Sequence, residues 1–120
     1  MLIQHRSLQE ILRLHKLWLD GNINGERADL RGIDLRGADL EDADFRDANL
    51  IDANFEDANL IDANFEDANL NFTNFRNARL RYADFEGANL RYADFEGANL
   101  SDANLKDANL DGTSLEYINK

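Results

Sequence analysis

Between Ala28 and Leu115 the chain repeats a five-residue pattern without a break in phase. Each unit has a small residue, then Asp or Asn in most cases, then Leu or Phe, then two variable residues. The small residue is Ala in 15 of the 18 units, and the exceptions are Ile33, Thr73 and Thr113. The large apolar residues are Leu30, Leu35, Leu40, Phe45, Leu50, Phe55, Leu60, Phe65, Leu70, Phe75, Leu80, Phe85, Leu90, Phe95, Leu100, Leu105, Leu110 and Leu115.

A period of five fits neither an amphipathic helix nor a plain strand. On a helix, steps of five residues would spread the Leu and Phe side chains around every face. In a strand, every second Leu or Phe would point to the opposite side. The pattern therefore predicts one very short extended segment and one bend in each unit. The large residue and the small residue two positions before it would point inward, and the Asp or Asn between them outward. Such fixed repetition is typical of a solenoid.

The pattern Ala-(Asp/Asn)-(Leu/Phe)-x-x from Ala28 to Tyr117 resembles that of the pentapeptide-repeat proteins. This resemblance implies an all-β solenoid, namely a right-handed quadrilateral β-helix in which four units form one coil. The 18 units would then form about 4.5 coils.

Four units in a coil would place residues twenty positions apart directly above one another. Aromatic rings one coil apart can pack as offset stacks. The two aromatic inner walls would consist of Phe45, Phe65 and Phe85, and of Phe55, Phe75 and Phe95. The ten-residue strings of 51–70 and of 81–100 are each repeated without a change. These duplications leave two origins open, an engineered, consensus-like repeat protein and a natural protein with recently duplicated units.

Residues 1–25 have a period of 3.6 instead of five. Ser7 with Glu10 forms a capping box and Gly21 is a stop signal, so we expect a helix from Leu8 to Asp20. Its apolar face would contain Leu8, Ile11, Leu12, His15, Trp18 and Leu19. The first coil of a solenoid has an open apolar end and unpaired backbone groups, which need a cover.

The predicted domain organisation is therefore a capping helix and turn at 1–25 and a pentapeptide-repeat β-helix at 26–120. In this arrangement we expect Trp18 to plug the end of the first coil and His15 to pack at its rim.

The chain is acidic, with 24 acidic and 13 basic residues and a net charge of −11. Residues 1–25 carry +1, so the remainder carries −12. Negative charge of this size disfavours binding to nucleic acid or to anionic membranes, and it can attract a basic surface. The chain contains no Cys, no apolar run as long as a membrane span of about 18 residues, and no signal-peptide pattern at its start. We therefore expect a cytoplasmic protein.

No catalytic, cofactor-binding or metal-binding residue is predicted. His5 and His15 are too far apart for a zinc pair on one helix face. Asp42, Asp44 and Asp47 lack the glycine and terminal glutamate of a calcium loop. An interior filled with Leu and Phe leaves no cavity for a substrate, so we expect that the protein is not an enzyme and needs no cofactor.

The outward positions of a four-unit coil would form columns. One column, Arg36, Glu56, Arg76 and Glu96, alternates in sign, and this predicts ion pairs between coils. Another column places Phe72 beside Tyr92, with Ile51 nearby. We interpret this as a self-contained aromatic pair, and a contact site for a partner is the alternative.

Two functions agree with these features. The first is a non-enzymatic structural or protein-interaction solenoid, natural or engineered, whose protein partner the sequence does not name. The alternative, implied by the resemblance, is an acidic mimic of DNA that binds or protects DNA gyrase. Some members of the family also pair through their C-terminal ends, so a homodimer through the C-terminal coil is a further expectation.

Overall fold

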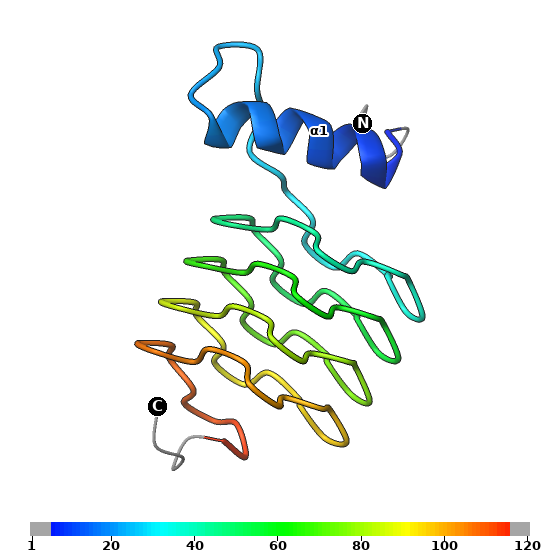
Figure 1. Cartoon of the computed structure of the whole chain (residues 1–120), viewed down its shortest axis with the longest axis vertical. Helices are drawn as coiled ribbons and strands as arrows, with labels where there is room; N and C mark the ends of the chain where they lie inside the picture. The colour runs from blue at the N-terminus through cyan, green and yellow to red at the C-terminus, as the bar shows by residue number, and fades with distance from the viewer. Residues whose placement is uncertain (1–5, 116–120) are drawn as a thin grey trace.

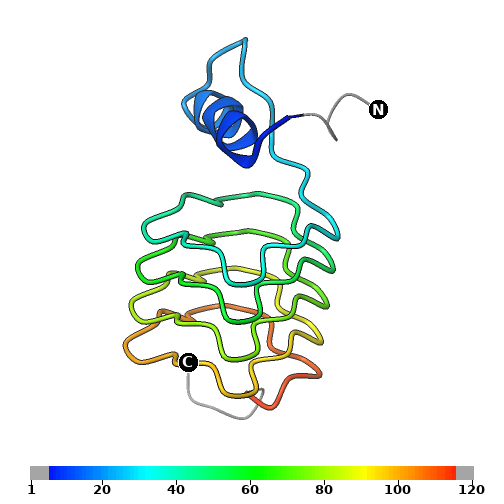
Figure 2. The ribbon, with the colours of Figure 1, turned by 90° about the vertical axis from the view of Figure 1, so that its right-hand side faces the viewer.

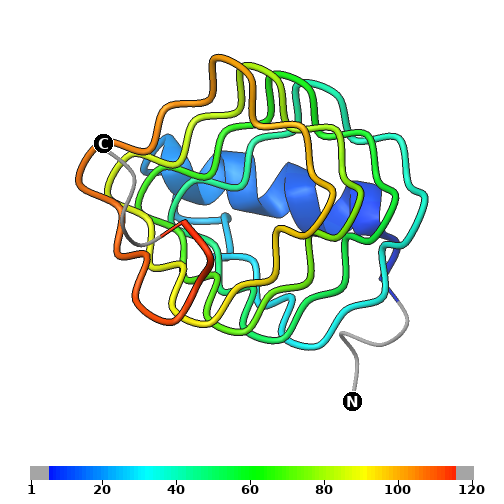
Figure 3. The same ribbon diagram turned by 90° about the horizontal axis from the view of Figure 1, so that it is seen from below.

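The computed structural model describes residues 6–115. Within this range the chain forms one helix, α1 (Leu8–Leu19), followed by a stack of coils (Figure 1). The coils lie at even spacing below α1 (Figure 2), and their four-sided outlines superpose when the stack is viewed from below (Figure 3). The stack of coils is therefore a solenoid, as the period of five predicts.

Adjacent coils are joined by parallel bridges between residues twenty positions apart. The bridges run from Asp29↔Asn49 to Asn89↔Asn109, and every one involves the position that precedes Leu or Phe. In residues 6–115 each bridge is isolated, because the chain bends again before a longer strand can form. The register of twenty confirms that four five-residue units make one coil.

The Asp or Asn of each unit has a specific role in satisfying the backbone. Unit 73–77 illustrates the pattern. Three amide groups donate to carbonyls of neighbouring coils at 2.8–2.9 Å, namely Asn74 to Ala53, Phe75 to Asp94, and Asn77 to Glu96. The Thr73 amide closes the preceding turn, and the Arg76 amide donates to Asn74 Oδ1 at 2.9 Å. The side chain before Leu or Phe thus accepts from the one N–H that the coil-to-coil ladder leaves free.

The corners are formed by the two variable residues of each unit. At the corner Leu40–Ala43, the Ala43 amide donates to the Leu40 carbonyl at 3.0 Å, and Asp42 between them has φ 65°. A positive φ at the third residue is the signature of a type II turn, which favours Gly, Asn or Asp at that position. The corresponding residue of every unit from 32 to 112 has positive φ, and only Phe72, Tyr82 and Tyr92 among them are neither Gly, Asn nor Asp.

The interior is filled by two columns of stacked phenylalanine rings. Phe45 and Phe65 stack with centroids 5.2 Å apart and an interplanar angle of 8°, and Phe55 and Phe75 do so at 5.3 Å and 4°. Rings of the two columns meet edge to face, as Phe65 and Phe75 do at 5.7 Å and 81°. The Leu residues of the central coils are equally inaccessible, and Phe45 and Leu60 have no exposed surface. The predicted walls of Phe are confirmed.

Helix α1 lies across the first coil with most of the predicted face inward, since Leu8 and Leu12 also pack against the core (Figure 1). Ile11, Leu14 and His15 are buried, and Leu14 was not on the predicted face. The prediction that Trp18 plugs the end was wrong, because its side chain is 38% exposed and stacks on His15 at 5.6 Å. The helix ends at Leu19, one residue before the predicted end, because Asp20 is its C-cap.

The signals at the ends of α1 act largely as predicted. Ser7 accepts a hydrogen bond from the Glu10 amide at 3.0 Å, which is the first half of a capping box. The Glu10 carboxylate does not complete the box, because it binds Arg13 through two hydrogen bonds of 2.8 and 2.9 Å. Gly21 has φ 79° and ends the helix as expected.

We predict that Ala63→Arg largely abolishes folding. Ala63 has no exposed surface, so the guanidinium would have to enter a filled interior without a partner. The matched control is Glu66→Lys, an outward position three residues later, which should melt like the wild type. Thermal melts followed by circular dichroism test both variants, and a cooperative, near-native melt of Ala63→Arg would contradict the interior assignment.

Candidate functional site

Functional groups must lie on the outside of the solenoid, because its interior is closed by side chains. The surface has shallow, open depressions. One of about 500 Å³ is bordered by Asp34, Arg36, Gly37 and Asp57 at a corner. Another of about 360 Å³ lies beside Tyr92. Both are open to solvent, so they resemble contact surfaces more than enclosed substrate sites.

Three aromatic side chains occupy corner positions that elsewhere hold Gly, Asn or Asp. Phe72, Tyr82 and Tyr92 have φ of 60–61° and are 56%, 51% and 54% exposed. Phe72 and Tyr92 lie on the same corner one coil apart and stack at 5.1 Å and 12°, which confirms the predicted pair. Tyr82 lies on the opposite corner, ten residues from each, with the Arg81 guanidinium 5.1 Å from its ring centre. The pairing thus leaves more than half of both stacked side chains accessible.

Glycines at the corners make room for side chains of the preceding coil. A Cβ on Gly112 would collide with the ring of Tyr92, and one on Gly87 would collide with the carboxylate of Asp67. A corner side chain therefore leans over the next corner of its column. The stacked arrangement predicted for Phe72 and Tyr92 follows from this lean.

The ion pairs follow a more local rule than the one predicted. Arg36 binds Asp34 of its own unit through hydrogen bonds of 2.8 and 2.9 Å, instead of Glu56 one coil away. The pairs Arg31–Asp29 and Arg46–Asp44 have the same two-residue spacing. The expected pairing between coils does occur where Arg76 binds Glu96 at 3.1 Å. The local pairs form in place of pairs between coils because Asp and Arg two residues apart flank the same bend.

Four carboxylates lie at or beside the corner of residues 66–67 and 86–87, which is next to the corner of Phe72 and Tyr92. We call them the acidic ridge: Glu66, Asp67, Asp84 and Glu86. The pKa of Glu66 is raised, first by loss of solvent around the carboxyl and then by the charges of Asp84, Asp67 and Glu86. Arg46 opposes this shift. Among residues 6–115 no cation forms an ion pair with the ridge, and Asn104 donates to Asp84 and Glu86 at 3.2 and 3.3 Å. The ridge is a local excess of negative charge.

His15 connects α1 to the first coil through both ring nitrogens. The Ala28 amide donates to Nδ1 at 2.9 Å, so this nitrogen must be unprotonated. Nε2 then carries the proton and donates to the Arg46 carbonyl at 2.6 Å. The side chain has no exposed surface. The prediction that His15 packs only at the rim was therefore wrong, and no periodicity argument could have revealed its two backbone partners.

The position of His15 determines how it titrates. Its pKa is lowered, mainly by burial, while the Arg46 carbonyl, Asp44 and Asp47 act to raise it and Arg27 acts to lower it. Protonation of Nδ1 would also replace an acceptor by a second donor facing the Ala28 amide. The neutral imidazole is therefore the form that holds α1 on the coil.

The other residues considered as sites are separated by the fold. Asp44 binds Arg46 at 2.7 Å, so it is not free for a cation together with Asp42 and Asp47. Within residues 6–115 no group of three or more His, Asp or Glu side chains could hold a metal ion. His5 lies outside the described residues.

We predict a stability loss in acid that depends on His15. The unfolded chain takes up a proton near pH 6.5, while the buried ring resists it, so the contribution is complete above about pH 6.5. It is lost as the pH falls through the lowered pKa of the folded state. Urea unfolding at several pH values between 7.5 and 5 measures this slope.

The control is His15→Ala, which should cost about 2 kcal/mol or more at pH 7.5, because the Ala28 amide and the Arg46 carbonyl lose their partner. It should also flatten the dependence of stability on pH between 6.5 and 5. An unchanged slope in this variant would show that other groups cause the acid sensitivity.

The chain is similar in sequence to a known repeat family. The sequence model described as "Pentapeptide repeat region" matches residues 38–115. No curated protein matches the chain. α1 has 12 residues, and no helix within the described range is long and apolar enough to cross a membrane.

Two solved structures show the same architecture. HetL, a pentapeptide repeat protein involved in heterocyst differentiation regulation from the cyanobacterium Nostoc sp. strain PCC 7120, is 41% identical with a TM-score of 0.73. The match covers 77% of this chain but only 42% of HetL, so the chain spans less than half of that protein. AT2G44920, a pentapeptide repeat protein from the Arabidopsis thaliana thylakoid lumen, is 35% identical with a TM-score of 0.53, and the match covers 78% of this chain and 68% of that one.

QnrB1, a plasmid-mediated fluoroquinolone resistance protein, is also similar, but at 20% identity and a TM-score of 0.43 over 72% of this chain and 67% of that one. A likeness this remote carries no argument about function.

Proposed function

Because the chain belongs to the pentapeptide repeat family, we propose that it is a non-enzymatic scaffold that binds a protein partner on its outer surface. The observation that carries this proposal is the filled interior. The Phe and Leu side chains of the central coils have no exposed surface, so the accessible chemistry lies on columns of outward side chains. These columns repeat at the spacing of the coils, which gives a partner a rigid and regular surface.

The family relationship agrees with a binding role. HetL is described as involved in heterocyst differentiation regulation, and a regulatory role agrees with binding to a partner. This chain spans 42% of HetL, so the partner of HetL is not transferred to it. The cytoplasm stays our prediction for the location, and AT2G44920 shows that the same fold also occurs in the thylakoid lumen.

We also propose that residues 1–25 serve as the cap and residues 26–120 as the repeat β-helix of about 4.5 coils. The hydrogen bonds of His15 to Ala28 and Arg46 support this division. Arg27 adds a bond of 2.6 Å from its Nε to the Asp47 carbonyl. His15 of α1 thereby supplies partners for backbone groups at the end of the first coil, and Arg27 of the repeat segment adds one more.

A homodimer through the C-terminal coil stays part of the proposal. Leu100, Leu105 and Leu115 are only partly buried, whereas Leu60 and Leu80 in the central coils are fully buried. Light scattering of the purified chain would show twice the monomer mass if the dimer forms.

Photo-crosslinking tests the scaffold function. A photoreactive amino acid replaces one outward residue on each of the four corners, for example Glu56, Glu66, Tyr82 and Phe72, and the chain is irradiated in an extract of its host. We expect one discrete adduct that forms from one or two corners, and the same adduct from the purified partner at micromolar concentration. The interior position Ala63 cannot serve as a control, because a large side chain there is expected to prevent folding. The control is therefore the unirradiated sample. If none of the four photoreactive variants forms an adduct with a purified candidate partner, the proposal is contradicted.

The alternative is an acidic mimic of DNA that acts on DNA gyrase. The net charge of −11 and the acidic ridge favour it. Arginines paired with Asp29, Asp34 and Asp44 argue against it, because they interrupt the negative surface. We predict that micromolar protein leaves supercoiling by purified gyrase unchanged. Inhibition or protection that disappears in Glu66→Lys would instead favour the mimic.

A further inference from the structure

The corner that carries Phe72 and Tyr92 combines exposed rings with few charged side chains: among residues 51–52, 71–72 and 91–92, only Asp52 and Arg91 are charged. We define the amide–aromatic patch as Ile51, Phe72 and Tyr92 at this corner together with Asn69, Asn74 and Asn89 on the two adjoining faces. Every one of these residues is uncharged, in a chain with a net charge of −11. Low charge and exposed aromatic side chains are typical of the centre of a protein interface.

The coil itself does not need aromatic residues at this corner. Asp62 and Gly87 occupy equivalent corners with φ of 62° and 69°, which Gly and Asp adopt more easily than Phe or Tyr. An aromatic residue in this left-handed conformation is strained, and exposed strain is concentrated at functional sites. Stacking between Phe72 and Tyr92 offsets part of this strain, but it leaves them 56% and 54% exposed.

The asparagines of the patch present hydrogen-bond donors. Asn69 Oδ1 accepts from the Asn71 amide at 3.3 Å, Asn74 Oδ1 from Arg76 at 2.9 Å, and Asn89 Oδ1 from Arg91 at 3.4 Å. These bonds orient each side chain so that the oxygen faces its own backbone and the Nδ2 group faces away. No residue among 6–115 accepts from these three Nδ2 groups. Asn69 and Asn89 lie one coil apart, so their donors form a row along the axis.

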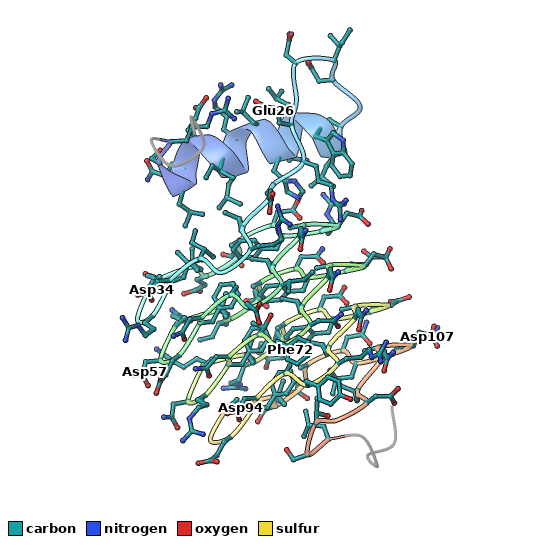
Figure 4. All side chains as sticks on the ribbon, turned by 180° about the vertical axis from the view of Figure 1, so that it is seen from behind. Glu26, Asp34, Asp57, Phe72, Asp94 and Asp107 are labelled. Carbon is teal, nitrogen blue, oxygen red and sulfur yellow. The ribbon has the colours of Figure 1, made fainter. Side chains whose placement is uncertain are left out.

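Acidic residues flank the patch on both sides. On one side the patch ends at Asn69 and Asn89, and the acidic ridge lies beyond them. On the other side lie Asp57 and Asp94, of which Asp94 is paired with Arg76 at 3.2 Å, and Figure 4 shows Phe72 between these two residues and Asp107. Negative charge on the ridge is already unfavourable, since loss of solvent and then the charges of Asp84, Asp67 and Glu86 raise the pKa of Glu66. A cationic partner would relieve this repulsion.

We propose that the amide–aromatic patch binds an extended, basic segment of a protein partner. An apolar side chain of the segment packs on Phe72 and Tyr92, its backbone carbonyls accept from the asparagine Nδ2 groups, and its Lys or Arg side chains reach the flanking carboxylates. This inference rests on the scaffold function proposed above and names the surface and the chemistry of the partner.

A peptide array tests the inference with defined probes. The labelled full-length chain is applied to nine-residue peptides that have Leu or Phe at the centre and Lys on both flanks. Two matched arrays have Glu flanks, or Ser in place of the apolar centre. We expect binding to the Lys-flanked, apolar-centred peptides only, and fluorescence anisotropy then gives the affinity of the best peptide.

The chain offers a matched pair of variants. Phe72→Asn with Tyr92→Asn removes both rings of the patch, while Tyr82→Asn removes an equally exposed ring on the opposite corner. Asn is tolerated at all three positions because Asn77 adopts the same conformation, with φ 58°. We expect the double variant to bind the best peptide about tenfold or more weakly and Tyr82→Asn to bind within about twofold of the wild type. Thermal melts establish that both variants are folded.

Three results would overturn the inference: no binding to any Lys-flanked peptide, equal binding to Ser-centred peptides, or equal loss in the two variants. The scaffold function is tested separately by the crosslinking experiment. A partner that crosslinks only from Tyr82, on the opposite corner, would uphold the scaffold function and refute the patch.

Discussion

The structure depends on hydrogen bonding between the coils of a backbone that never runs straight for more than a few residues. A chain that bends every five residues cannot form long strands, so its amide groups need other partners. The register of twenty lets Phe75 and Asn77 donate to one neighbouring coil and Asn74 to the other. The Asn74 side chain then accepts from Arg76. Where Arg79 replaces the Asp or Asn, no side chain within residues 6–115 accepts from the Arg81 amide, which lies at an exposed corner.

This constraint also explains why the molecule's functional groups are on its surface. The same register that completes the ladder stacks Phe45 on Phe65 and closes the interior with ring contacts near 5 Å. Variation is tolerated only at the two corner residues and, to a lesser degree, at the Asp or Asn. The acidic ridge, the local Arg–Asp pairs and the exposed rings all lie at these positions. A partner would therefore recognise corners, and the corner with Phe72 and Tyr92 is the one where two stacked aromatic rings replace the residues that the turn prefers.

The first part of the chain shows where sequence reasoning stops. Helical periodicity placed His15 and Trp18 on one apolar face, and their rings do stack on each other. Which of them enters the core depends on the rotation of α1 about its axis, and that rotation follows from contacts with the first coil. His15 is selected because only its ring can serve both the Ala28 amide and the Arg46 carbonyl, 13 and 31 residues away. The larger indole of Trp18 has a single donor and remains partly exposed.

The sequence by itself determined the solenoid, the inward and outward positions and the two columns of Phe. It could do so because an unbroken period leaves one geometry in which every Leu and Phe is buried. The three-dimensional structure alone decided the partners of individual side chains: Arg36 with Asp34 instead of Glu56, His15 instead of Trp18 against the coil, and the lean of Tyr92 over Gly112. These choices depend on distances of a few ångströms between residues that the repeat treats as equivalent. Periodicity specifies the backbone, and the competition among nearby charges, donors and rings specifies the surface.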